Sequence, residues 1–480
     1  MVASIKSNTI KQNAKSLESE VIKGTSVAVS KYIEDNIEKL ILKKQGLLLY
    51  DGITPSLVRD QVFDTDKRIL TGVYSDKYDW DAYFISSTLL EMSPRKYSEV
   101  VKSSVLNFLS FTTPDGYVPR TIGYDGVKDF PGHHKPFFFQ MLSQMHSKGL
   151  SLDWLMAKHK GYEWKKTYTG LVQENDDPAF WSQEDYQKNL NLVGFKPLDR
   201  LEQYLEFYDV FRKVPDCGLY SWINIVESGI DTNLALRPRV FAPTGDVTKD
   251  TIFTSSPVPR IAAVDLNVYL YNEFKAASEV FKLLGEPSKA DYYKQKASQI
   301  QEKFFSVFWD KKEQFFYNRY FKLDGSSELI NVPSWIGFLP LSSDGLIDES
   351  THPEISELII NEHILSDEGF MTPYGVRSMS RRSPVSGGVA PRALVPEHWF
   401  EAANWNGPIW VLTNIYAIEI LNKYGYIEYA SIVHRRMNYL LSKDITNNGC
   451  MHEQYSYVDG KPGWAEDFMS WNTLMWVLNS

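Results

Sequence analysis

The feature that most constrains the fold of this chain is a helical pattern of apolar residues that recurs between residues 30 and 479. In each segment the apolar residues return after three or four positions, which places them on one face of an α-helix. No regular alternation of strands and helices appears, and this disfavours a doubly wound sheet or a TIM-type barrel. The predicted helices are 30–45, 81–91, 97–110, 136–148, 184–191, 198–212, 265–284, 287–309, 409–424, 427–443 and 468–479. Antiparallel pairs joined by short loops would account for most of them.

One short stretch, 314–322, has the composition of a strand, with a hairpin turn beside Gly325. Four long connections separate the helices, at 111–135, 149–183, 236–262 and 366–400. Loops of this length in a compact domain are usually functional or disordered, so we expect them to gather at one rim and shape a site. The last connection is a candidate lid, with a passive surface loop as the open alternative.

No linker or low-complexity tract divides the chain, so we expect a mobile tail at 1–29 and a single domain at 30–480. The net charge of −9 and the lack of a dense basic run make nucleic acid a poor partner. No apolar run approaches the length of a membrane span. Two cysteines and a polar N-terminal stretch without a secretory pattern predict a cytoplasmic protein. A homo-oligomer is left open.

Aromatic residues are abundant, with 13 Trp, 28 Tyr and 26 Phe. Most such side chains fill a core, but a chain this rich often places some of them against a sugar ring or a similar ligand. The stretch Tyr78–Phe84, which reads YDWDAYF, holds both aromatic rings and carboxylates that could meet such a ligand. Asp81 stands at the start of a predicted helix, where an aspartate commonly caps the helix. The alternative is that its carboxylate binds sugar hydroxyls while Trp80 packs on the sugar ring.

A second stretch, Tyr220–Asn233, reads YSWINIVESGIDTN and ends in acidic residues around a glycine. Asp231 would act as a general acid if apolar neighbours such as Trp222 raised its pKa. Gly229 would allow a close approach of the backbone or a positive φ. The simpler explanation is that Asp231 caps the next segment.

Two further stretches complete the series, NWNGPIW at 404–410 and GCMHEQYSYVDGKPG at 449–463. In the first, Gly407 and Pro408 suit the start of a helix, and Trp405 is either core or a surface for a sugar. In the second, Glu453 follows a histidine, but no His-x-x-x-His or cysteine cluster accompanies it, so we expect no metal. Two carboxylates on separate segments with indoles around them are what glycoside cleavage needs: an acid for the leaving oxygen and an ionised partner.

In this order, YDWDAYF, ESGID, NWNGPIW and HEQYSYVDGKPG resemble glycoside hydrolase family 63 over about residues 70–480. The chain is most similar to the short enzymes that hydrolyse mannosylglycerate and glucosylglycerate, and trehalases share the ESGID element. The resemblance implies an all-α (α/α)6 barrel. It also implies an inverting mechanism without a metal or organic cofactor.

The resemblance also assigns roles to residues. It makes Asp231 the general acid and Glu453 the general base that activates water. Residues implied to bind the sugar are Tyr78, Trp80, Asp81, Trp222, Gly229, Trp405 and Gly407, with Gln140 as a looser match. For the glycerate carboxylate an arginine fork is the best partner. Arg260 is the first choice for it; Arg237, Arg239, Tyr374 and Arg377 are further candidates, and a surface arginine is an equally open explanation for each.

The sequence therefore predicts an inverting α-glycosidase that hydrolyses a small glycosyl-glycerate solute to hexose and glycerate. One alternative is a trehalase-like enzyme or an α-glucosidase that acts on a neutral sugar, which would not need an arginine at the leaving group. Another is a carbohydrate-binding protein without activity, and the least favoured is a helical scaffold for protein partners. The paired acids Asp231 and Glu453 favour catalysis over both binding alternatives.

Overall fold

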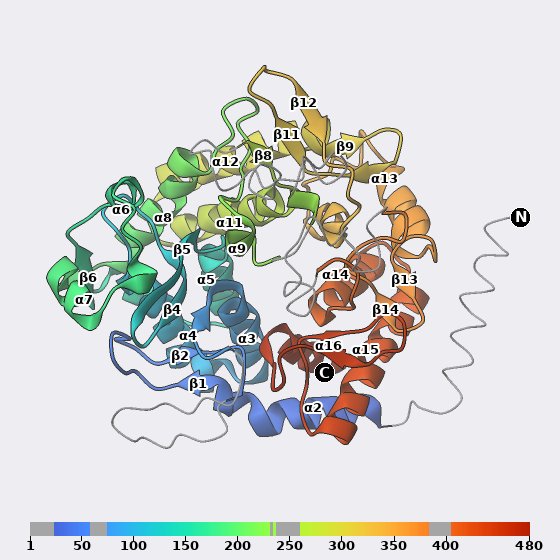
Figure 1. Ribbon diagram of the computed structural model, residues 1–480, viewed down its shortest axis with the longest axis horizontal. Helices are drawn as coiled ribbons and strands as arrows, with labels where there is room; N and C mark the ends of the chain where they lie inside the picture. The colour runs from blue at the N-terminus through green and yellow to red at the C-terminus, as the bar shows by residue number, and fades with distance from the viewer. Residues whose placement is uncertain (1–23, 58–73, 231–233, 237–259, 384–404) are drawn as a thin grey trace, which may run out of the picture.

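The helices of the computed structural model form a ring of inner segments surrounded by outer ones (Figure 1). The structure describes residues 24–57, 74–230, 234–236, 260–383 and 405–480. Its inner segments are α3 (Asp79–Met92), α5 (Phe138–Ser147), α11 (Val264–Leu283), the 3-10 turns η6 (Trp335–Gly337) and η7 (Leu339–Ser342), α14 (Val411–Lys423), and η10 (Ser470–Thr473) followed by α16 (Leu474–Asn479). Each of these contacts the next, and η10 and α16 contact α3, so the inner ring closes.

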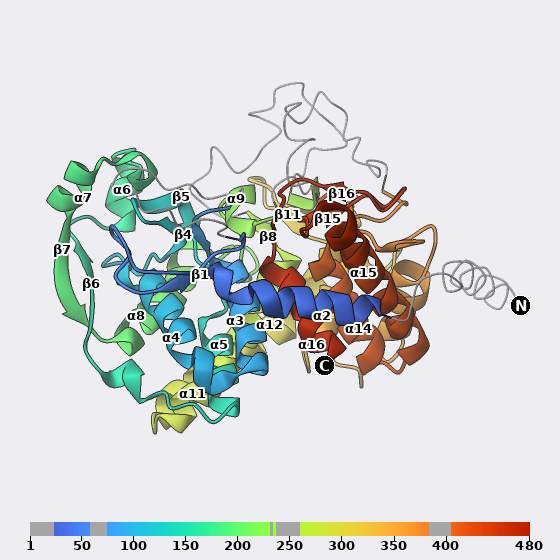
Figure 2. The ribbon, with the colours of Figure 1, turned by 90° about the horizontal axis from the view of Figure 1, so that it is seen from below.

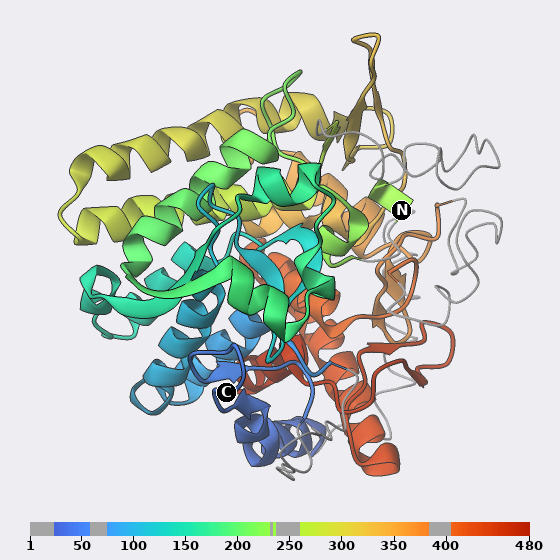
Figure 3. The same cartoon turned by 60° about the vertical axis from the view of Figure 1, so that its left-hand side comes forward.

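An outer segment accompanies each inner one. The outer segments are α4 (Pro94–Ser110), α8 (Pro197–Phe211), α12 (Pro287–Phe308), α13 (Ile355–Leu358) with the π-helical η8 (Ile359–Ile364), α15 (Ile427–Asn448) and α2 (Thr25–Asn36). Figure 3 shows α11 and α12 as a long antiparallel pair. Gly285 (φ 77°) and Gly425 (φ 81°) adopt the left-handed conformation that lets the chain turn back after α11 and α14.

The inner helices are apolar on nearly every side because they pack against both the outer helices and one another. Helix α14 shows this, since most of its residues, from Val411 to Leu421, are buried. Outer helix α4 instead buries one face, with Val101, Val105 and Leu109 among its core residues. The helical pairs predicted from the sequence are therefore present. The predicted helix at 30–45 is wrong beyond Asn36, where a 3-10 turn η1 (Ile37–Leu40) and strand β1 (Ile41–Leu42) follow.

Short antiparallel strands occupy several connections. The described sheets are β1 with β2 (Gly52–Ile53); β3 (Lys77–Tyr78), β4 (Pro119–Gly123) and β5 (Gly126–His133); β6 (His159–Trp164) and β7 (Leu190–Phe195); β8 (Ile261–Ala262), β11 (Arg319–Phe321) and β12 (Ser327–Leu329); β9 (Trp309–Asp310) and β10 (Phe315–Phe316); β13 (Met371–Thr372) and β14 (Gly375–Val376); β15 (Gln454–Tyr455) and β16 (Pro462–Gly463). The predicted hairpin beside Gly325 is present as β11 and β12.

The connections 111–135 and 149–183 are not plain loops, because they carry β4, β5, β6 and three short helices, η2 (Asp153–Met156), α6 (Tyr168–Gln173) and η3 (Pro178–Phe180). A further helix, α7 (Gln183–Asn189), lies at the predicted 184–191. Residues 237–259 of the connection 236–262 lie outside the described residues, and so do residues 384–400 of the connection 366–400, which was the candidate lid. Of the predicted tail, residues 1–23 lie outside as well, and α2 begins at Thr25. Figure 2 shows α9 (Ile225–Ser228), β5 and the β15–β16 hairpin on one face of the ring.

Candidate active site

A cavity of about 270 Å³ opens on this face, above the inner helices. It lies where the first turn of α3, strands β4 and β5, helix α9 and the segments at 405 and 453 meet. Six of the residues predicted to form the site lie together on its wall: Tyr78, Trp80, Asp81, Gly229, Trp405 and Glu453. The other described residues that line it are Pro55, Tyr74, Arg120, Asp129, Val226, Phe468 and Trp471.

Asp81 lies in the first turn of α3 but does not cap that helix. The neighbouring Asp79 instead accepts a hydrogen bond from the backbone N–H of Trp80 at 2.8 Å. Asp81 accepts one from the hydroxyl of Ser470, which η10 brings from the far end of the chain. Burial raises the pKa of Asp81 to about 6. A buried carboxylate on a cavity wall is suited to accept hydrogen bonds from sugar hydroxyls when it is ionised.

The α9 turn carries the backbone toward Asp231. Its Glu227 is fully buried, forms an ion pair with Arg212 at 2.8 Å, and accepts hydrogen bonds from the backbone N–H groups of Ile223 and His133. Gly229 then turns the chain with φ 70°. A Cβ atom at that position would lie 2.9 Å from Trp80 and 3.0 Å from the Lys135 Nζ atom, so a glycine is required there. Asp231 itself lies outside the described residues.

Glu453 lies just before β15 and is 4% exposed. The Tyr74 hydroxyl lies 2.9 Å from its Oε1 and 3.0 Å from its Oε2, so the phenol donates to this carboxylate. The segment around Glu453 is held by Asp444, which accepts hydrogen bonds from the His452 backbone at 2.9 Å and from the Tyr455 hydroxyl at 2.8 Å. The carboxylate is thus placed at the cavity by contacts on both sides of it.

Three indoles form one side of the cavity. The ring of Trp80 lies 5.3 Å from that of Trp471 and 6.0 Å from that of Trp405, centre to centre. Trp405 in turn stacks on the buried Trp410 at 3.8 Å. A rigid wall of aromatic rings suits the apolar face of a sugar.

The other predicted residues that the structure describes are not among those that line this wall. Gln140 donates its amide to the carbonyl of Pro136 at 2.6 Å and sits against Glu273. Trp222 is buried behind the cavity, where its indole N–H reaches Asp265 at 3.1 and 3.2 Å.

Gly407 is buried, and its N–H donates to the Ser378 hydroxyl at 3.0 Å. Tyr374 lies in the turn between β13 and β14, with its ring against Gly460. Arg260 leads into β8, and its carbonyl accepts from the Phe321 N–H at 2.9 Å. Arg377 is buried with its guanidinium 3.9 Å from the ring centre of Tyr457. Arg237 and Arg239 lie outside the described residues.

The sequence argument missed three residues of the wall, Tyr74, Arg120 and Asp129. Arg120 lies on β4, donates to the carbonyl of Val226, and is 3.5 Å from a carboxylate oxygen of Asp129 on β5. Among the described residues of the wall, Arg120 is the one cation beside three carboxylates, Asp81, Asp129 and Glu453. For Arg120 and Asp129 the signal was the connection 111–135, which was predicted to shape the site, but no motif within it singles out these two side chains.

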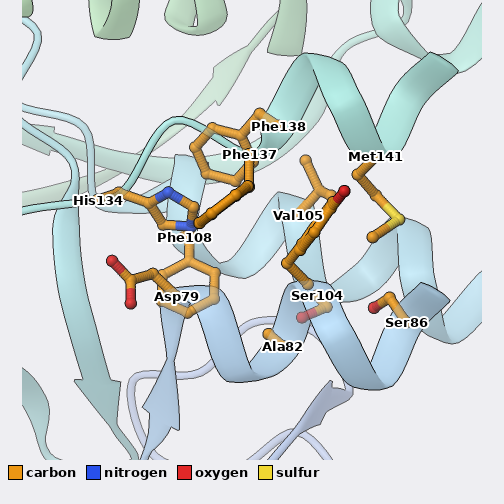
Figure 4. Close-up of a pocket in the computed structure, with 11 residues that line it drawn as sticks. Asp79, Ala82, Ser86, Ser104, Val105, Phe108, His134, Phe137, Phe138 and Met141 are labelled. Atoms are coloured by element: carbon orange, nitrogen blue, oxygen red, sulfur yellow. The ribbon is translucent and has the colours of Figure 1, made fainter. Parts of the chain in front are cut away.

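A second cavity, about 20 Å³, lies between α3, α4 and α5 (Figure 4). Asp79 and His134 lie together on one side of it, and Val105 and Met141 on the other. It has room for about one water molecule and is too small for a sugar. Within the described ranges, no group of three His, Cys, Asp or Glu side chains could hold a metal, and no helix is long and apolar enough to cross a membrane.

The ring of paired helices with acidic and indole side chains at one mouth defines a class, the (α/α)6 glycoside hydrolases. Residues 193–471 match the family described as "Mannosylglycerate hydrolase MGH1-like glycoside hydrolase domain". The match covers more than half of the chain, so the chain belongs to this family and is a glycoside hydrolase. A comparison with curated proteins finds no match.

Solved structures share the fold at low sequence identity. The GH63 mannosylglycerate hydrolase from Thermus thermophilus in complex with Tris and D-glycerate has a TM-score of 0.60 and 16% identity, over 95% of this chain and 100% of that one. Its complex with glucose gives the same score and identity, over 95% and 99%. The neutral trehalase Nth1 from Saccharomyces cerevisiae has a TM-score of 0.53 and 16% identity, over 90% and 73%. The predicted (α/α)6 fold is confirmed.

Proposed function

We propose that this protein is an inverting α-glycosidase that hydrolyses a small glycosyl-glycerate, such as mannosylglycerate or glucosylglycerate, to hexose and glycerate. The observation that carries the proposal is the cavity itself. It brings the Glu453 carboxylate to the same wall as Gly229, which lies two residues before Asp231 in the sequence. Glu453 and the turn that precedes Asp231 in the sequence therefore border one cavity of about 270 Å³.

In this mechanism Asp231 donates a proton to the glycosidic oxygen while Glu453 removes a proton from the attacking water. A phenol has one O–H, so the Tyr74 hydroxyl satisfies part of the Glu453 carboxylate and leaves it acceptor capacity for a water proton. The indoles of Trp80, Trp405 and Trp471 give the sugar a fixed face. Ionised Asp81 binds its hydroxyl groups. No residue in this scheme requires a metal or an organic cofactor.

The glycerate part of the proposal depends on a cation for its carboxylate. Arg120 is the cation that the described wall supplies, and it lies beside Val226 on the turn that leads to Asp231. An arginine near the acid is near the leaving group, because the acid protonates the oxygen that joins the sugar to the leaving group. Arg120 therefore replaces Arg260 as the first candidate to bind the glycerate carboxylate.

One observation favours a neutral leaving group as a second candidate. Asp129 lies 3.5 Å from Arg120 and already balances its charge. A trehalase-like or α-glucosidase activity on a neutral disaccharide would leave this ion pair intact. The Arg120→Met variant separates the two, because it should weaken turnover of glycosyl-glycerates far more than turnover of neutral disaccharides only if the carboxylate binds there.

The test is to incubate the purified protein with mannosylglycerate, glucosylglycerate, trehalose and kojibiose and to measure the release of hexose. Proton NMR of the first product should show the β-anomer of the sugar before mutarotation. Release of the α-anomer first would refute the role of Glu453 as the base that activates water. Turnover of the neutral sugars alone would refute the glycerate assignment.

A further inference from the structure

A fully buried lysine lies directly behind the cavity wall. The side chain of Lys135 is 0% exposed, and its Nζ atom lies 3.2 and 3.4 Å from the two carboxylate oxygens of Asp79, which is equally buried. The Lys135 backbone N–H also donates to Asp79 at 2.8 Å. The mechanism above uses neither residue.

The ammonium group of Lys135 lies close to residues that form or support the cavity wall. It lies 4.6 Å from the ring centre of Trp80, whose indole faces the cavity, and 5.9 Å from that of Trp222. A Cβ at Gly229 would come within 3.0 Å of the same nitrogen. The lysine therefore supports two wall residues at once, the indole of Trp80 and the turn that precedes Asp231.

Its charge also acts on Asp81 and Asp265, two carboxylates for which the described part of the chain shows no ion pair. Burial raises the pKa of Asp81 and of Asp265 to about 6 each, and the positive charge of Lys135 counteracts that rise. The hydrogen-bond donors described for these two are neutral, the Ser470 hydroxyl for Asp81 and the Trp222 indole for Asp265. The other charged or titratable groups near Asp81 and Lys135 are Asp79, Arg120, Tyr78 and His134.

A buried ion pair is a poor source of stability. Removing two charges from water costs several kcal/mol per ion, and apolar residues of the same volume often give an equally stable protein. A lysine and an aspartate in this place are therefore better explained by what they do for the neighbouring cavity than by the stability of α3.

We propose that Lys135 is a positioning residue of the active site: held by Asp79, it fixes Trp80 and the Gly229 turn and places a positive charge near Asp81. The effect on turnover rests on the proposed function, because it assumes that the sugar occupies this cavity. The effect on Asp81 does not, and it can be measured without a substrate.

The experiment compares Lys135→Met, Asp79→Asn and the double variant with the unmodified protein. Each single change leaves one buried charge uncompensated, so we expect a lower melting temperature in both. The double variant removes both charges, and its melting temperature should return toward the original. Its kcat/KM at pH 7 should remain about 10- to 100-fold low, because the wall is no longer fixed. The acid limb of the Lys135→Met pH profile should lie at higher pH, because Asp81 then loses the nearby positive charge and keeps the Asp79 carboxylate beside it.

The charge on Asp81 is read separately by a carbon-13 NMR titration of labelled aspartate, with Asp81→Asn to assign the signal. In Lys135→Met the Asp81 carboxyl should titrate at higher pH than in the unmodified protein, and in Asp79→Asn at lower pH, because the Asp79 charge raises the pKa of Asp81 and the Lys135 charge lowers it. An unchanged Asp81 titration would overturn the inference, whether or not any sugar is cleaved. A double variant that regains both stability and full kcat/KM would also overturn it, because the pair would then be merely structural.

Arg436→Met is the matched control. Arg436 is another buried cation, on α15, and it donates to the carbonyl of Thr372 at 2.8 Å, away from the cavity. Its loss should lower the melting temperature without moving the Asp81 titration or the pH profile. If no variant and no unmodified protein cleaves a sugar, the proposed function fails, while the Asp81 titration still decides the role of Lys135.

Discussion

Two segments of this enzyme border one cavity, one with the turn that precedes the proposed acid in the sequence and one with the proposed base. Each segment is held by a buried carboxylate that has no role in the proposed chemistry. On the α9 side, Glu227 accepts from two backbone N–H groups and pairs with Arg212. On the β15 side, Asp444 accepts from the His452 backbone and the Tyr455 hydroxyl, and it contacts the His452 ring.

The two buried carboxylates, Glu227 and Asp444, differ in the charge of the groups that bind them. Arg212 keeps its charge at every working pH and would be left uncompensated if Glu227 were lost. The partners described for Asp444 are a backbone N–H, a phenol and side chains that do not carry a permanent charge. The segment that leads to the proposed acid is thus fixed by an ion pair, and the segment with the proposed base by hydrogen bonds. We call Glu227 and Asp444 the anchors of the two segments, and replacing them should lower the stability by different amounts.

The largest effect is expected from the two catalytic groups themselves. Asp231→Asn and Glu453→Gln should each lower kcat by about 10²- to 10⁴-fold on a natural glycoside. A glycosyl fluoride needs no proton on its leaving group, so it should restore much of the rate of Asp231→Asn but none of the rate of Glu453→Gln. Steady-state kinetics on both substrates check this. Equal behaviour of the two variants on the fluoride would show that the roles are wrongly divided.

The next largest effects are expected from the two anchors, Glu227 and Asp444. Glu227→Gln leaves Arg212 as an unpaired buried charge and should cost about 3–5 kcal/mol of unfolding free energy. Asp444→Asn removes an acceptor from neutral donors and should cost about 1–3 kcal/mol. Urea titrations followed by circular dichroism measure both. The combination of Arg212→Met with Glu227→Gln serves as the control, since it should recover part of the loss. Equal costs at the two anchors would remove the distinction between them.

A methyl group tests the α9 turn. Gly229→Ala places a Cβ within 3.0 Å of Trp80 and Lys135 at a residue with φ 70°, so the turn must move. We expect about 1–3 kcal/mol of lost stability from strain and displacement. Turnover should fall as well, because the displaced turn leads directly to Asp231. Gly285→Ala, at a left-handed position with open space around it, controls for backbone strain alone.

The smallest expected effect is on the base side. Tyr74→Phe removes one hydrogen bond to a charged group and keeps the ring, so kcat should fall about 10-fold with little change in melting temperature. The measurement is kcat and KM on the same glycoside. A change in KM alone would mean that Tyr74 binds the sugar and does not orient Glu453.

Much of the fold followed from the sequence because long amphipathic helices are visible as a repeat of apolar residues. Three places where the prediction failed are short segments. Residues 335–342 form inner 3-10 turns and 359–364 a π-helical turn, and neither is long enough to show a helical repeat. The segment after Asn36 continued an apolar pattern, yet it turns into a short strand because its partner, β2, lies there.

The candidate site, like the fold, was predicted from the sequence only in part. Motifs with unusual residue combinations located Trp80, Asp81, Gly229, Trp405 and Glu453, which the structure brings to one wall. Tyr74, Arg120 and Asp129 were not predicted, because only the tertiary fold brings them to the cavity. Tyr74 meets Glu453 across 379 positions of sequence. Arg120 and Asp129 meet across the β4–β5 hairpin. Gln140 was assigned from a loose match to the family and Arg260 from its place in the loop after Asp231, and neither observation says which way a side chain faces.

The closure of the inner ring has a consequence for how the protein reaches its native state. Its last contacts join α16 to α2 and α3, with the Trp476 indole donating to Glu34 across 442 positions of sequence. Contacts so far apart close the largest loops and are slow to form. Phe468, Ser470 and Trp471, which complete the cavity and hold Asp81, belong to the same late segment. During synthesis the helical pairs can therefore assemble in order, while the catalytic pocket is among the last parts to exist.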